Sequence, residues 1–168
     1  TPGLAGWWGH DKSSQFDMTL GFTPAPNAGA WQVGTPSVLG AAALYGALAV
    51  ANEAGIDRVR AKSLALTGLL LDLVDARLVP LGFTSPTPRD DARRGGHVAL
   101  THPEAAGIVQ ALKARGVVPD FRPPNIVRLA PVAFYTRFVD VWDAVDILSE
   151  IATTQAHRAF ANQRGVVA

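Results

Sequence analysis

An arginine in the middle of a short apolar segment is the first residue that could carry chemistry. Arg128 lies within residues 126–130, whose residue types predict a β-strand. Alternate residues of a strand share a face, so Ile126, Arg128 and Ala130 are expected to point to one side. A guanidinium there is costly to bury without an anion. Two interpretations fit: an internal salt bridge with an aspartate or glutamate, and bidentate recognition of a substrate carboxylate, which suits arginine better than lysine.

Two segments near the N-terminus are candidates for binding a flat or anionic group. In the first, Gly6–His10, two glycines around Trp7 and Trp8 let the backbone approach a ligand, although plain core packing of the tryptophans is the favoured interpretation. In the second, Thr35 precedes Pro36 and an apolar run, which predicts a helix N-cap. A helix N-terminus also binds anions, so the Thr35 hydroxyl is a candidate phosphate contact.

Several other kinds of chemistry are excluded or not expected. The chain has no cysteine, and His10, His97 and His102 show no metal-ligand spacing, so we expect no metal site. Fifteen Lys and Arg against 14 Asp and Glu give a net charge of +1, too balanced to attract nucleic acid by charge. The run 89–94 is interpreted as a solvated loop of mixed charge. No signal peptide is evident, and the apolar stretch 38–51 is too short to span a membrane, so we expect a cytoplasmic protein.

The elements that must position these residues follow from hydrophobic spacing. The chain has 168 residues, enough for one domain with an attached arm, and residues 1–34 are rich in glycine, proline and tryptophan. Apolar residues make up 48% and charged residues 17%, so part of the surface is not expected to face water. An α+β fold with helices on one face of a small sheet is predicted. Helices are expected at 36–54, 57–77, 103–115 and 138–154, and strands at 83–87, 97–101, 117–121 and 126–130.

Motifs in a fixed order along the chain resemble kynureninase from residue 2 to about residue 150. They are PGLAGWWGH (2–10), QFDM (15–18), WQVGTP (31–36), RAKSLALT (60–67), TPR (87–89), RGGHV (94–98), RGVV (115–118), IVRLAP (126–131), Tyr135 and DVW (140–142). The resemblance implies an aspartate-aminotransferase-like fold (pyridoxal-phosphate fold-type I), related to class V aminotransferases. It implies hydrolysis of L-kynurenine to anthranilate and L-alanine in tryptophan catabolism, the kynurenine pathway that also serves NAD biosynthesis.

The resemblance implies binding roles for three residues. Trp7 is expected at the phosphate of pyridoxal 5'-phosphate, with its indole N–H as donor, and Thr35 at the same phosphate. Both are similar to residues that reach across a homodimer interface into the neighbouring subunit's site. Arg128 matches the arginine that holds the substrate's α-carboxylate, which favours the substrate interpretation over the salt bridge. We therefore expect Arg128 at an open edge of the small domain, without a full bidentate partner and without a structural partner on which folding depends.

The resemblance also implies that part of the enzyme lies outside these residues. The family's Schiff-base lysine precedes the Gly-Trp motif, and none of Lys12, Lys62 and Lys113 matches it. We therefore expect no catalytic residue in this chain and no activity from the chain by itself. Residues 1–55 are interpreted as the end of the large cofactor-binding domain with a linking helix, and residues 56–168 as the small C-terminal α+β domain.

The partners expected on this interpretation are a small-molecule substrate, the N-terminal part of the same enzyme and a second subunit of a homodimer. Neither nucleic acid nor a membrane is expected. The alternative is a non-catalytic binding or assembly module derived from the fold-type I small domain.

Overall fold

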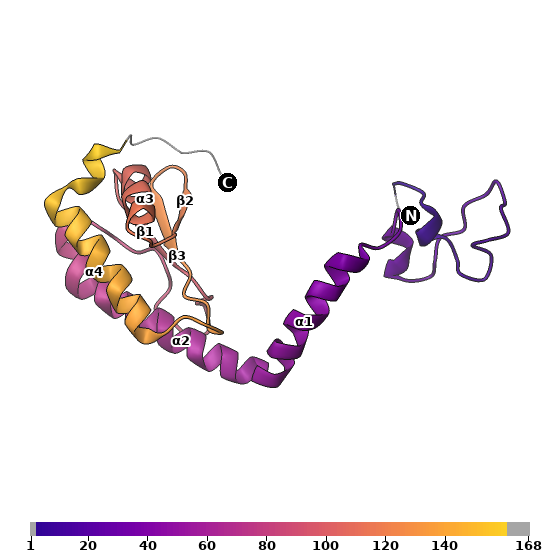
Figure 1. Ribbon diagram of the computed structural model, residues 1–168, viewed down its shortest axis with the longest axis horizontal. Helices are drawn as coiled ribbons and strands as arrows, with labels where there is room; N and C mark the ends of the chain where they lie inside the picture. The colour runs from indigo at the N-terminus through magenta and orange to yellow at the C-terminus, as the bar shows by residue number, and fades with distance from the viewer. Residues whose placement is uncertain (1–2, 161–168) are drawn as a thin grey trace. The chain divides into compact units, whose positions relative to one another are not determined.

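The computed structural model describes residues 3–160 (Figure 1). The chain separates into two compact units, Thr1–Glu53 and Ala54–Ala168, and each is described by itself. Within residues 3–160, no helix is long and apolar enough to cross a membrane. The assignment of the units to a large and a small domain stays a prediction.

The first unit consists of an irregular arm and a long helix (Figure 1). The arm contains two short 3-10 turns, η1 (Trp7–Gly9) and η2 (Ala28–Trp31), and the helix α1 spans Val38–Ala54. A long helix over 36–54 was expected from the sequence, and the structure confirms it with a start two residues later. Its cap is different, however. The Ser37 hydroxyl accepts the Gly40 N–H at 3.2 Å, so the prediction that Thr35 caps this helix was wrong.

The helix α1 presents apolar side chains on every side. Its sequence up to Asn52 carries no charge, yet none of its residues is buried by the described part of the chain. Leu39 and Tyr45 are largely exposed, and Leu44 and Val50 are more than half exposed. A large apolar surface of this kind is rare on a protein that functions as a monomer, and it is typical of a surface that packs against further polypeptide.

The second unit is a small three-stranded antiparallel sheet covered by helices (Figure 1). The strand order is β1-β3-β2, so the last strand in the sequence lies in the centre. This arrangement confirms the predicted α+β class. The elements are α2 (Ile56–Leu73), a π-helical turn (Val74–Leu78), η4 (Val79–Leu81), β1 (Val98–Thr101), α3 (Ala105–Ala114), β2 (Asp120–Arg122), β3 (Ile126–Leu129), α4 (Phe138–Thr154) and η5 (Ala156–Ala159).

One face of the sheet is buried against the three helices of this unit. Val98, Leu100, Val127 and Leu129 alternate with less buried residues along β1 and β3, as a half-buried sheet requires. The helices contribute a continuous apolar cluster at helical spacing. Its fully or nearly fully buried members include Leu66, Leu70 and Leu71 of α2, Ile108 and Leu112 of α3, and Val145, Leu148 and Ile151 of α4.

The strand predicted at residues 83–87 does not form. Thr84 forms an isolated β-bridge with Thr101. Beyond it, side-chain hydrogen bonds to β1 take the place of backbone hydrogen bonds between strands. Ser85 donates its hydroxyl to the Ala99 carbonyl at 2.9 Å, and the Thr87 hydroxyl accepts the Ala99 N–H at 2.9 Å. The physical reason lies in the prolines at 86 and 88, which have no N–H to donate to a neighbouring strand.

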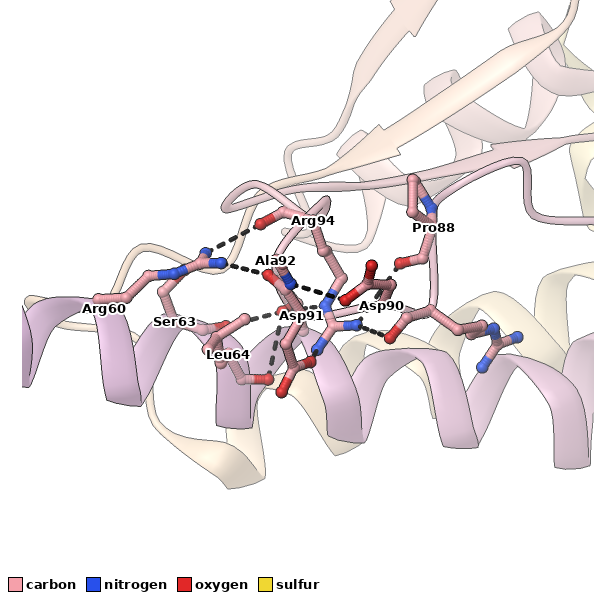
Figure 2. A network of polar contacts seen from close by, with 10 residues as sticks. Arg60, Ser63, Leu64, Pro88, Asp90, Asp91, Ala92 and Arg94 are labelled. Atoms are coloured by element: carbon pink, nitrogen blue, oxygen red, sulfur yellow. Dashed lines mark hydrogen bonds and ion pairs between the residues drawn. The ribbon is translucent and has the colours of Figure 1, made fainter.

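The loop at residues 88–94 is fixed to α2 by a buried arginine (Figure 2). Arg94 is only 6% exposed and donates from Nε to the Thr67 hydroxyl at 3.0 Å. Its Nη1 donates to the Arg89 carbonyl at 2.6 Å, and its Nη2 pairs with the Asp91 carboxylate. Arg60 of α2 adds a bond from Nη1 to the Arg94 carbonyl at 2.9 Å. The expectation of a solvated loop was therefore wrong for Arg94, because every edge of its guanidinium has a partner.

Replacing Arg94 tests this connection. We expect Arg94→Lys to lower the free energy of unfolding by about 2–4 kcal/mol, since a lysine cannot satisfy three separated acceptors and leaves buried groups unpaired. The neighbouring Arg93→Lys is the matched control and should change it by less than about 0.5 kcal/mol, because Arg93 is exposed. Urea denaturation followed by circular dichroism measures both. Equal effects of the two changes would show that the Arg94 network does not stabilise this unit.

Candidate functional site

The first candidate site lies in the arm, where two glycines allow two stretches of backbone to come into contact. A Cβ added at Gly6 would lie 2.0 Å from the Val33 carbonyl oxygen, and one at Gly9 would lie 2.5 Å from the Ala30 carbonyl oxygen. No side chain fits at such distances. The glycines of the GWWGH motif therefore bring η1 against η2 and the segment that follows it, which contains Thr35.

Trp8 is half-buried and holds Thr35. Its indole Nε1 donates to the Thr35 hydroxyl oxygen at 3.0 Å. Lys12 lies over the Trp8 ring at 4.6 Å and donates from Nζ to the Trp8 carbonyl at 2.6 Å, which keeps the ring in place. Because the Thr35 hydroxyl accepts this bond and does not cap the helix, its own O–H remains available to a ligand. Sequence reasoning named Trp8 in the motif but did not identify it as the residue that positions Thr35.

Trp7 faces outward. It is 51% exposed, and its ring meets the rings of Trp8 and Phe16 edge-on at 5.9 and 5.5 Å. Within residues 3–160, its indole N–H has no partner. Trp7 also lines a cavity of about 340 Å³ together with His10, Ser14, Gln15, Met18 and Thr19. The two adjacent tryptophans thus have different roles: Trp8 supports Thr35, and Trp7 presents a hydrogen-bond donor at the surface. The core-packing interpretation therefore does not hold for Trp7.

The polar groups around this cavity are fixed by local hydrogen bonds. His10 is buried; its Nδ1 accepts the Thr23 N–H at 3.3 Å, and its Nε2 lies 3.1 Å from the Ser14 hydroxyl. A neutral imidazole has one donor and one acceptor nitrogen, so Nε2 carries the proton, and His10 supports the arm.

The hydroxyl and N–H of Ser13 lower the pKa of Asp11. Among the described residues, no three His, Cys, Asp or Glu side chains gather as metal ligands.

The second candidate site is the exposed face of the small sheet. The register of β3 places Ala99 of β1, Arg128 of β3 and Asp120 of β2 side by side. Directly paired residues of antiparallel strands carry their side chains on the same face. Val127 and Leu129, which alternate with Arg128, are buried in the core. Arg128 therefore stands on the face of the sheet that the helices do not cover, as a strand alternation over 126–130 predicts.

Arg128 has a partner within the chain. Its Nη2 forms an ion pair with Oδ2 of Asp120, so the expectation that it lacks a structural partner was wrong. The sequence could not show this pair, because the register of β2 against β3 depends on how the intervening turn is folded. The pair uses a single nitrogen, and the Arg128 side chain remains 34% exposed. Nε and Nη1 have no partner within the described chain, and Nη2 carries a second N–H, so one two-nitrogen edge of the guanidinium remains available to a carboxylate.

The charges on this face are not balanced. The same Oδ2 of Asp120 also accepts a hydrogen bond from Arg122 Nε at 2.7 Å. Two guanidinium groups therefore share one carboxylate, and the cluster keeps one net positive charge. Such a cluster attracts an anion, and the planar edge of Arg128 suits a carboxylate.

A cavity of about 260 Å³ adjoins this face at Ala99, the cross-strand neighbour of Arg128. Its other lining residues are Pro86, Thr87, Pro88, Arg93, Gly95 and His97. The side chains of Arg93 and His97 have no partner among residues 3–160. The cavity is thus polar and cationic on one side, which fits an anionic ligand near Arg128.

The three residues predicted to bind ligands lie in different units. Trp7 and Thr35 belong to the arm of the first unit, where Trp8 lies between them. Arg128 belongs to the sheet of the second unit. Their roles toward a cofactor or a substrate stay predictions.

Comparison with known proteins identifies relatives along almost the whole chain. The sequence model described as "Kynureninase C-terminal domain" matches residues 59–148. Kynureninases of Geobacillus thermodenitrificans and Bacillus cereus are each 51% identical over 167 residues, and that of Shouchella clausii is 47% identical over the same length. These alignments cover 99% of this chain but 39% of each relative. The chain therefore spans about two fifths of the length of the curated relatives that it matches.

The close backbone approach at Gly6 generates a prediction for the arm. Gly6→Ala should displace η1 from Val33, because a Cβ has no room there, and should release the contact between Trp8 and Thr35. Hydrogen exchange of the Gly9 and Ala25 amides, which are bonded within the arm, is expected to become faster. Gly21→Ala is the matched control, since its added Cβ meets nothing within 4 Å. Unchanged exchange in Gly6→Ala would contradict the geometry of the arm.

Proposed function

The chain belongs to the kynureninase C-terminal domain family, and from that premise we propose that it forms the C-terminal portion of an enzyme that hydrolyses L-kynurenine to anthranilate and L-alanine. This reaction belongs to tryptophan catabolism, in the kynurenine pathway toward NAD. The observation that carries the proposal is Arg128: a partly exposed guanidinium with an unused edge on a sheet face of net positive charge. A carboxylate of an amino-acid substrate is the anion that such an edge suits best.

We propose pyridoxal 5'-phosphate as the cofactor and assign two of its phosphate contacts to this chain. The residues of the arm fit a phosphate, because Trp7 presents an indole N–H and Thr35 an O–H, both exposed and neither used as a donor within residues 3–160. When bound, the cofactor supplies a ring that accepts electrons from the bond being broken. The chain's contribution is to hold the phosphate and to fix the Thr35 hydroxyl through Trp8.

The substrate contact that we assign to this chain is electrostatic. Arg128 binds the α-carboxylate through the edge that Asp120 leaves free and thereby orients the amino acid toward the cofactor. Orientation contributes to catalysis without any proton transfer by Arg128, because a guanidinium stays protonated in proteins. The lysine that joins the cofactor is expected in the part of the enzyme outside this chain, so we expect no activity from the chain alone.

We further propose that α1 and the arm are covered by the remaining part of the enzyme and by a second subunit. Two observations support this. The helix α1 is apolar all round with no buried residue within the described chain, and the relatives contain about 60% of their length beyond the matched region. On this proposal the first unit ends a large cofactor-binding domain of fold-type I, and the enzyme is a homodimer. A cytoplasmic location also stays a prediction.

Loss of the indole donor tests the cofactor assignment. In the complete enzyme, Trp7→Phe should weaken binding of pyridoxal 5'-phosphate by about tenfold or more, because a hydrogen bond to a charged group contributes about 1.5–3 kcal/mol. Thr35→Val should act in the same direction. Trp31→Phe is the matched control, since Trp31 is also an exposed tryptophan of the arm. Titration of the apoenzyme with the cofactor measures each affinity, and a Trp7 variant with unchanged affinity would overturn the assignment.

Replacing the carboxylate arginine tests the proposed reaction. In the complete enzyme, Arg128→Lys should raise KM and lower kcat/KM by roughly 10–1000-fold, on the order of 1.4–4 kcal/mol, because lysine keeps the charge but loses the fork. The free energy of unfolding should fall by less than about 1 kcal/mol, since the pair with Asp120 is partly exposed. Arg115→Lys, in the exposed pair with Glu150, is the control. Near-normal activity of Arg128→Lys, or its failure to fold, would assign Arg128 to structure.

A further inference from the structure

Asp120 is placed to act on Arg128 and on nothing else of the candidate substrate site. The two residues are cross-strand partners in β2 and β3, and their side chains form an ion pair on the exposed face. Among the described residues, the Asp120 carboxylate pairs only with Arg128 and with Arg122 of its own strand. Its carboxylate is part-exposed, so the pair contributes little to folding.

The carboxylate of Asp120 is itself held in place. Its Oδ2 accepts the Arg122 Nε–H at 2.7 Å as well as the Arg128 Nη2–H. Arg122 follows Asp120 by two residues on the same strand, so all three side chains share the exposed face. Arg122 thus fixes Asp120, and Asp120 fixes one terminal nitrogen of Arg128. The opposite neighbour, Ala99, is small and leaves the other side of the guanidinium open.

This arrangement reduces the cost of binding a carboxylate. A free arginine side chain loses rotamer entropy when it is immobilised on a ligand, and a guanidinium already held by one nitrogen has lost that entropy in advance. The negative charge of Asp120 would by itself repel a substrate carboxylate. Arg122 compensates for it, because the three groups together keep one net positive charge.

We propose that Asp120 is a positioning residue that holds the Arg128 guanidinium in the orientation that receives the substrate's α-carboxylate. The inference rests on the proposed function of Arg128 and adds to it a second residue of the same site. It also reconciles the two interpretations of Arg128, because the internal ion pair is then a part of the substrate-binding site and not an alternative to it.

The test compares variants of the complete enzyme on two ligands: L-alanine and the corresponding amine without the carboxylate, ethylamine. Asp120→Ala should weaken L-alanine binding about tenfold and raise KM for the amino-acid substrate by a similar factor, with kcat changed less. Ethylamine binding should not change. Glu150→Ala is the matched control, because it removes a carboxylate from another exposed arginine pair of the same unit. Asp120→Asn keeps the shape and an acceptor oxygen but loses the charge, so it should weaken L-alanine binding measurably but less than Asp120→Ala, and it is the test variant if Asp120→Ala does not fold.

A double-mutant cycle distinguishes failure of this inference from failure of the proposed function. If Asp120 acts through Arg128, Asp120→Ala should weaken L-alanine binding little further in an Arg128→Lys background. If Arg128→Lys weakens L-alanine binding and neither Asp120 variant does, the positioning role is wrong while the substrate role of Arg128 stands. If Arg128→Lys itself leaves L-alanine binding unchanged, the proposed function of Arg128 fails. Equal weakening of both ligands by Asp120→Ala would show a general structural effect and overturn the inference.

Discussion

The pairing of β3 with both of its neighbours is the constraint on which the second unit depends. Its register turns Val127 and Leu129 into the helical core and leaves Arg128 on the opposite face. A shift by one residue would bury the guanidinium and expose the two apolar side chains. The same register brings Asp120 and Ala99 to either side of Arg128. One set of backbone hydrogen bonds therefore closes the core and also assembles the candidate carboxylate site.

The arm depends on a different constraint, which is the absence of side chains at Gly6 and Gly9. Their backbone lies against Val33 and Ala30, and the indole of Trp8 then reaches the Thr35 hydroxyl. The result is that two donors, the Trp7 indole N–H and the Thr35 O–H, are exposed and are not used within residues 3–160. The next element in the sequence is α1, an apolar helix with no residue buried within the described chain. The chain spans about two fifths of the length of its relatives, and both features support the proposal that other parts of the enzyme cover these surfaces.

Much of this fold could be predicted from the sequence because hydrophobic spacing and helix-terminating residues are local signals. The helix over 138–154, the strand around Arg128 and the α+β class were predicted in this way. Contacts between residues distant in the sequence were not predicted. The burial of Arg94 depends on Thr67, 27 residues earlier, and the pair of Arg128 with Asp120 depends on register. Two local predictions were wrong, because Ser37 and not Thr35 caps α1, and because the prolines at 86 and 88 prevent a strand at 83–87. The kynureninase resemblance was confirmed by the relatives, whereas the roles of Trp7, Thr35 and Arg128 stay predictions.

A structure of the complete enzyme with L-alanine bound would test the central claim most directly. The account predicts that the α-carboxylate of L-alanine accepts two hydrogen bonds from one edge of the Arg128 guanidinium, while Asp120 keeps its contact with Nη2. A carboxylate bound by other side chains, with Arg128 still paired to Asp120 alone, would contradict the account and assign Arg128 to the stability of the sheet.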